Sequence, residues 1–158
     1  MAWGNSGIFG QTIMDALTQT AAIDLDGHTF KVALYNNSVT PAYSGAAAVN
    51  AFGAGTWSGT EVTGTGWVTG GYDLTSVVFA IDQPAAGQFR FDSANPSQPT
   101  TTLANIYGCM VYDDTITTPV ADQGLFAVAF SGAPYSTTAG TLTITVDTNG
   151  WFYSDFTP

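Results

Sequence analysis

The sequence predicts an all-β fold, either an antiparallel sandwich or a partly open barrel, with one N-terminal helix. Roughly six or seven short runs of β-branched and aromatic residues recur along the chain, and turn-forming residues separate them at intervals of about ten residues. Only one stretch, near the start, has apolar residues at helical spacing. This combination is typical of antiparallel β proteins and not of parallel α/β sheets, in which strands and helices alternate.

The chain has the size and composition of one domain. It has 158 residues, of which 45% are hydrophobic, including ten Phe, seven Tyr and four Trp. This apolar content is enough to form a substantial core and to offset the conformational entropy lost on folding. We expect a single domain over residues 1–158, with a helical segment at residues 1–20 and a β domain at residues 28–156.

The first predicted element is a helix from about Ile8 to Thr18, capped by Asn5 or Ser6. Its apolar positions at helical spacing are Phe9, Ile13, Ala16 and Leu17. A strand follows at residues 29–35, where apolar residues alternate. Residues 36–59 are rich in Asn, Ser, Pro, Ala and Gly and are expected to form a long loop.

The second half of the chain carries the other predicted strands. They cover residues 72–82, 88–91, 106–112, 124–130, 141–146 and 151–153. The runs at 106–112 and 124–130 are apolar at nearly every position, which indicates central strands, whereas 141–146 alternates Thr with aliphatic residues and should have one exposed face. Residues 92–102 are expected to form a second loop, and residues 147–150 a hairpin-type turn.

The charge balance excludes whole classes of partner. Twelve acidic residues stand against two basic ones, Lys31 and Arg90, and the formal net charge is −10. Such a surface repels phosphates, so we expect neither nucleic-acid binding nor binding to anionic membranes. The N-terminus has neither the basic region nor the long apolar region of a secretory leader, and no stretch reaches the length of a membrane span.

Few residues could support catalysis. His28 is the only histidine and has no nucleophile motif beside it, so it is interpreted as a turn residue and not as a general base. Cys109 is the only cysteine and lies in an apolar run without a nearby cation, which predicts a core residue and excludes a disulfide or a Cys-based zinc site.

The carboxylates raise two further possibilities, a glycosidase site and a calcium site. A glycosidase needs a pair of acids, and calcium needs several oxygen ligands. Glu61 is the only glutamate, and the close aspartate pairs at 24/26 and 113/114 lie at expected turns, where Asp bonds to its own backbone. Neither pair has EF-hand spacing, and the glycines at 64–71 lack the ending of a phosphate-binding loop. We therefore predict no catalytic residue, no cofactor and no metal site.

Three tryptophans lie among Gly, Thr and Asn residues. Trp57, Trp67 and Trp151 could stack on sugars, as in a carbohydrate-binding module, or could fill the core or a subunit interface. Each adjoins the end of a predicted strand, which favours packing.

Two motifs resemble a family of small structural proteins of tailed bacteriophages. The first is Asp-Leu-Asp-Gly-His-Thr-Phe-Lys-Val-Ala-Leu at residues 24–34, and the second is Glu-Val-Thr-Gly-Thr-Gly-Trp-Val-Thr-Gly-Gly-Tyr-Asp-Leu at residues 61–74. The family shows D-x-D-T-F-K-V-A-L followed by E-V-S-G-T-G-Y-x-x-G-G-x-x-L. This chain departs from it at Thr63 and Trp67, and it has Gly27 and His28 in addition before the T-F-K-V-A-L run. The similarity covers the first half of the chain and matches the second half only in its β character.

The resemblance implies a virion component, in particular a decoration or auxiliary protein on the outside of the capsid. A tail, head–tail or fibre component, or a module that binds carbohydrate on the host surface, remains the alternative, and a carboxylate hydrolase is a third class. The implied partners are the major capsid protein or other virion proteins and further copies of this chain, and the implied location is the virion after synthesis in the bacterial cytoplasm.

Protein contacts are then expected from the predicted helix, the loop at 36–59 and the second motif. In that motif the glycines permit close backbone approach or positive φ, and two apolar side chains serve as anchors. The candidate contact residues are Phe9, Ile13, Leu17, Tyr43, Phe52, Trp57, Val62 and Trp67.

Overall fold

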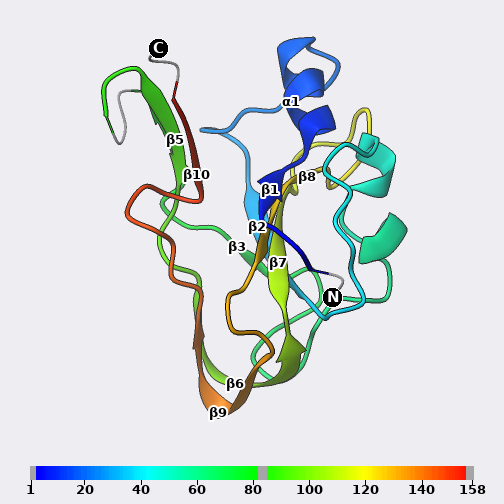
Figure 1. Cartoon of the computed structure of the whole chain (residues 1–158), viewed down its shortest axis with the longest axis vertical. Coiled ribbons are helices and arrows are strands. Elements are labelled where there is room, and N and C mark those ends of the chain that lie inside the picture. The colour runs from blue at the N-terminus through cyan, green and yellow to red at the C-terminus, as the bar shows by residue number, and fades with distance from the viewer. Residues whose placement is uncertain (1–2, 82–84, 156–158) are drawn as a thin grey trace.

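A computed structural model describes residues 3–81 and 85–155, which form two β layers and one α-helix (Figure 1). All sheets are antiparallel, and none closes into a barrel. The predicted fold class, a β sandwich with an N-terminal helix, is therefore confirmed.

The first layer is a five-stranded sheet in the order β1-β8-β7-β2-β3. Its strands are β1 (Gly7–Ile8), β2 (Phe30–Tyr35), β3 (Tyr72–Asp73), β7 (Gly108–Asp113) and β8 (Gly124–Ala129). The apolar runs predicted to be central form β7, which is buried at all six positions, and β8, whose first four residues are buried. Because β7 pairs with β2 on one side and β8 on the other, residues far apart in the sequence meet at the sheet centre.

The second layer consists of two separate sheets. A three-stranded sheet has the order β10-β5-β4, formed by β4 (Val78–Ile81), β5 (Gln88–Asp92) and β10 (Phe152–Asp155). A two-stranded ribbon pairs β6 (Ser97–Ile106) with β9 (Tyr135–Thr143). The main core lies between the layers, where Phe91 of β5 packs edge-on against Phe30 of β2 and Phe126 of β8.

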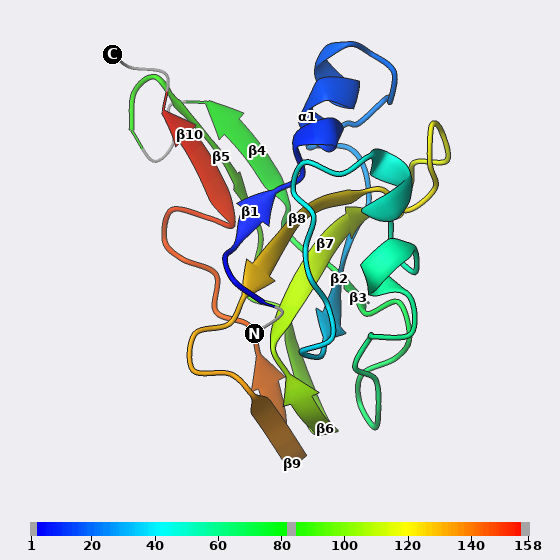
Figure 2. The same ribbon diagram turned by 45° about the vertical axis from the view of Figure 1, so that its right-hand side comes forward.

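A second core covers the opposite face of the first layer. The loop after β2 contains two short 3-10 turns, Ala47–Val49 and Gly55–Trp57, and runs along this face (Figure 2). The indole of Trp57 packs edge-on against the rings of Trp3, Phe9 and Tyr35. This aromatic cluster fixes both the long loop and the N-terminal segment to the sheet.

Helix α1 (Gly10–Leu17) confirms the predicted helix but begins later, because the residues before it serve the sheet. Strand β1 pairs with β8, and Phe9 occupies the cap position without a side-chain hydrogen bond. The expected cap at Asn5 or Ser6 is wrong: the Ser6 hydroxyl accepts a hydrogen bond from the Ala129 N–H, and the Asn5 carbonyl accepts one from the Tyr43 hydroxyl.

Three other expectations are corrected. The loop expected at residues 92–102 is largely strand β6, which includes Pro99 because pairing with β9 is interrupted between Gln98 and Thr101, where no ladder N–H is needed from the proline. Strand β9 begins at Tyr135 and not at residue 141. The turn at residues 147–150 forms, with the Gly150 N–H donating to the Asp147 carbonyl, but it leads from one sheet to another and closes no hairpin.

The run at residues 72–82 is divided into two strands. Strand β3 pairs with β2 of the first layer, whereas β4 pairs with β5 of the second. Ser76, with φ 54°, lies between them, and Asp82 lies outside the described residues. This short connection carries the chain from one layer to the other.

Candidate protein-contact surface

The eight candidate contact residues separate into an interior group and a surface group. Phe9, Trp57, Val62 and Trp67 are buried, with at most 8% of the side chain exposed. Val62 and Trp67 anchor the second motif to the main core, as the sequence predicted. These four side chains stabilise the fold and present almost no surface to a partner.

The remaining four candidates lie nearer the surface. Tyr43 stacks on Phe9, and Phe52 stacks on Tyr112, so both are half-buried. Ile13 is 39% exposed and Leu17 is 76% exposed, and both belong to helix α1. The loop at residues 36–59 therefore contributes mainly to the second core, while the helix contributes apolar surface.

Helix α1 is oriented with its polar side inward. Thr12 and Asp15 are buried, although both are polar. The Thr12 hydroxyl donates to the Gly124 carbonyl at 2.5 Å, and the Asp15 carboxylate accepts a bond from Gln123 Nε2 at 2.9 Å. Gln123 is itself fully buried, so the inner side of the helix is held by a polar network.

The outer side of α1 is consequently apolar. Met14, which the sequence did not single out, is 54% exposed between Ile13 and Leu17. Asp15 is the only charged residue of the helix and points into the protein, so no charge of the helix accompanies these three side chains. An amphipathic surface helix normally has the opposite arrangement. We call Ile13, Met14 and Leu17 the α1 patch. Helix α1 lies at the opposite end of the long axis from the β6–β9 ribbon (Figure 1).

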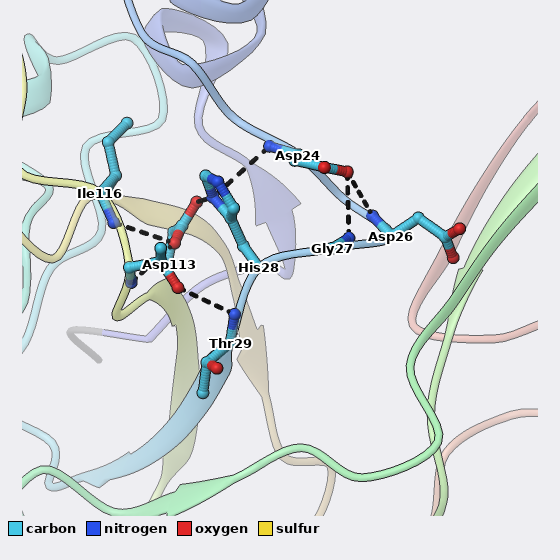
Figure 3. A network of polar contacts seen from close by, with 8 residues as sticks. Asp24, Asp26, Gly27, His28, Thr29, Asp113 and Ile116 are labelled. Carbon is cyan, nitrogen blue, oxygen red and sulfur yellow. Dashed lines mark hydrogen bonds and ion pairs between the residues drawn. The ribbon is translucent and has the colours of Figure 1, made fainter.

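The only histidine forms a polar network with a buried aspartate (Figure 3). His28 Nδ1 lies 2.6 Å from Asp113 Oδ2, and the Asp113 side chain is completely buried. The Asp24 N–H lies 3.5 Å from the same nitrogen, so the shorter contact assigns the Nδ1 proton to the bond with Asp113. Asp113 Oδ1 accepts the backbone N–H groups of Thr115 and Ile116, so both oxygens of this carboxylate are hydrogen-bonded within the protein.

The other candidate carboxylates also act locally. Asp24 Oδ1 accepts the N–H groups of Asp26 and Gly27, as expected for a turn aspartate. Glu61 Oε1 accepts the Gly70 N–H at 2.7 Å, while burial raises the pKa of Glu61 above its ordinary value. Among the described residues, no three His, Cys, Asp or Glu side chains converge where they could hold a metal ion.

Both cations of the chain are engaged in ion pairs. Lys31 Nζ lies 2.8 Å from Asp114 Oδ2, and this bond raises the pKa of Lys31. The Arg90 guanidinium lies 3.6 Å from the Asp92 carboxylate and also donates to the Thr148 carbonyl. Any anionic group on a partner would therefore have to displace an existing ion pair.

Cys109 is completely buried in β7, and desolvation strongly raises the pKa of its thiol. This burial confirms the prediction of a core cysteine. In the part of the chain that the structure covers, no helix has the length and apolarity needed to cross a bilayer.

Comparison with protein-family models, with curated proteins and with solved structures finds no match to this chain.

Proposed function

We propose that this chain is a structural protein of a bacteriophage particle, in particular a decoration or auxiliary protein that binds the outside of the capsid. The single observation that supports a binding role is the α1 patch, in which three apolar side chains are exposed on a helix that buries its Thr12 and Asp15. The two sequence motifs at residues 24–34 and 61–74 supply the setting, because they resemble structural proteins of tailed phages.

The α1 patch suits contact with another protein. Burying a side chain such as Leu17 contributes about 1.5–3 kcal/mol, and this gain is not reduced by desolvation of a charge within the helix. The polar network on the inner side fixes the helix, so little ordering entropy is lost when a partner binds. Many copies on one particle could then be held by modest individual contacts.

The proposal is tested by incorporation of variants into particles. Leu17→Glu places a charge in the centre of the contact and should lower the amount of protein that copurifies with virions by about tenfold or more. Ile81→Glu is the matched control, because Ile81 is 78% exposed and lies outside the α1 patch and outside the other predicted contact elements. Deletion of residues 1–18 is less informative, since it also removes Trp3 and Phe9 from the second core.

Two results would count against the proposal. One is equal incorporation of Leu17→Glu and the unaltered protein, while both unfold at the same urea concentration. The other is absence of the unaltered protein from purified virions. A copy number that matches the capsid lattice favours the decoration role, and a copy number that matches the tail favours the alternative.

A further inference from the structure

A groove opens into the main core at a distance from helix α1. It has a volume of about 440 Å³ and lies between the end of β8 and the segment that links β9 to β10. Its apolar lining includes Val128, Phe130, Leu142, Ile144 and Trp151, all of which belong to the main core cluster or pack against it. The groove is therefore a place where the sandwich core is open at its edge.

The topology explains why the core is open here. The N-terminal segment runs along one edge of β8, through β1 at Phe126 and Ala127 and through the Ser6 hydroxyl at the Ala129 N–H, so the opening lies on the side of β8 that faces the linking segment. The linking segment is tied away from β8: the Ile144 N–H donates to the Pro96 carbonyl, and the Val146 N–H to Asn95 Oδ1. Within the described chain, no hydrogen bond joins residues 128–131 to residues 142–151.

The lining selects an apolar occupant. A sugar would bring several hydroxyl groups against aliphatic side chains such as Val128 and Ile144, and each unpaired hydroxyl costs about 1–3 kcal/mol. The aromatic polar groups are already used, because the Trp151 indole N–H donates to the Ser93 hydroxyl and the Tyr135 hydroxyl donates to the Ser131 carbonyl. Apolar side chains have no such requirement and gain from leaving water.

The charges favour a partner other than a second copy. Among the residues that the structure describes, Asp147 is the only charged one that lines the groove, and it is exposed at the surface. A second copy brings another net charge of −10, and its Lys31 and Arg90 are held in their own ion pairs. A foreign segment with a lysine or arginine beside its apolar residues complements both the groove and Asp147.

The geometry points to a docking groove for a short apolar peptide segment of a different protein, with an adjacent basic residue that meets Asp147. This inference deepens the proposed function, on which it rests for the idea of a protein partner. It adds a second binding surface that is separate from the α1 patch, so that one copy can contact two neighbours.

The chain contains its own reporter for the groove. Trp3, Trp57 and Trp67 are at most 6% exposed, whereas Trp151 is half-buried and lines the groove. Quenching of tryptophan fluorescence by acrylamide should therefore report mainly on Trp151. The probes are a blocked peptide Gly-Val-Lys-Val-Leu-Gly, the same peptide with Glu in place of Lys, and maltohexaose as a neutral sugar.

We expect the lysine peptide to protect Trp151 from acrylamide in a saturable manner and the glutamate peptide to bind about tenfold more weakly or less. Val146→Lys, which places a positive charge in the groove and repels the peptide lysine, should weaken binding of the lysine peptide at least about tenfold, and Ile81→Lys should leave it unchanged. Asp147→Asn should remove the preference for lysine. If Val146→Lys does not fold, Thr145→Phe provides a second test, because it fills the groove from an exposed position.

The inference is overturned if the lysine peptide gives no saturable protection up to about 1 mM. It is also overturned if maltohexaose protects Trp151 and the peptide does not, if the Val146→Lys and Ile81→Lys proteins bind the lysine peptide equally, or if the protein closes the groove by forming dimers. All of these assays use the purified chain, so their failure leaves incorporation through the α1 patch unaffected, and loss of incorporation by Leu17→Glu leaves peptide binding unaffected.

Discussion

Two consecutive glycines in the second motif have different structural roles, which a pair of substitutions can separate. Gly70 has φ 87° and Gly71 has φ 73°, so an alanine at either position adopts the left-handed region. That conformation costs roughly 1–2 kcal/mol for a residue with a Cβ atom. At Gly70 this is the main cost, because a Cβ there would meet only the Tyr112 hydroxyl, at 3.5 Å.

At Gly71 a steric cost is added. A Cβ built on Gly71 would lie 1.8 Å from the Val32 carbonyl oxygen and 2.6 Å from the Val32 carbonyl carbon, both in the backbone of β2. The clash is relieved only if β3 moves away from β2, which disturbs the Val32–Tyr72 pair and the bond from the Leu74 N–H to the Phe30 carbonyl. Overpacking costs about 1–3 kcal/mol and each lost hydrogen bond about 1 kcal/mol more.

We therefore expect Gly70→Ala to lower the free energy of unfolding by roughly 1–2 kcal/mol and Gly71→Ala by roughly 3 kcal/mol or more. Urea denaturation followed by tryptophan fluorescence measures both values, and an unchanged m-value shows that the comparison is between similar transitions. Equal losses of unfolding free energy at the two positions would refute this reasoning, since they would show that the close approach of Gly71 to β2 does not affect stability.

Three further predictions follow from buried groups. Asp113→Ala leaves His28 and two backbone N–H groups without their acceptor and should cost about 3–5 kcal/mol in urea denaturation; a loss below about 1 kcal/mol would contradict this. Because the pKa of Glu61 is raised, the folded state binds this proton more tightly than the unfolded chain, so stability should rise as pH falls through the folded pKa towards 4.5. Glu61→Gln should flatten this rise, and an identical pH profile for the two proteins would speak against it. The Cys109 thiol should react with a disulfide reagent only at the rate of unfolding, and rapid labelling of the native protein would show that β7 is not sealed.

Local patterns in the sequence were sufficient to predict the central strands of the first layer. Strand β2 alternates, and β7 lacks charge up to Tyr112, because Cys109 and Val111 face the main core while Met110 and Tyr112 face the second core. The ribbon was not predictable in the same way. Much of β6 and β9 is exposed and rich in Thr and Ser, so it lacks an apolar pattern, and Pro99 indicates a loop.

The candidate surface shows a second limit of sequence reasoning. The spacing of Ile13 and Leu17 predicts that they share one face of a helix, but not that this face is exposed. Gln123 determines which face of the helix is buried, because it bonds to Asp15 although the two residues are 108 positions apart in the sequence. Contact between His28 and Asp113 similarly joins positions 85 residues apart. Such polar pairs leave no local periodicity, although the single charge in a short helix was a signal that it needed a partner.

The edges of the β6–β9 ribbon affect how copies of this protein meet at high local concentration. Its two strands carry no charged side chain, and charge is the common means by which exposed edges avoid pairing with other chains. The ribbon has instead three register shifts and a proline, which make its edges irregular. Neighbouring copies at high local concentration would therefore meet edges that cannot extend into a continuous shared sheet. We therefore expect the purified protein to form no fibres when it is concentrated.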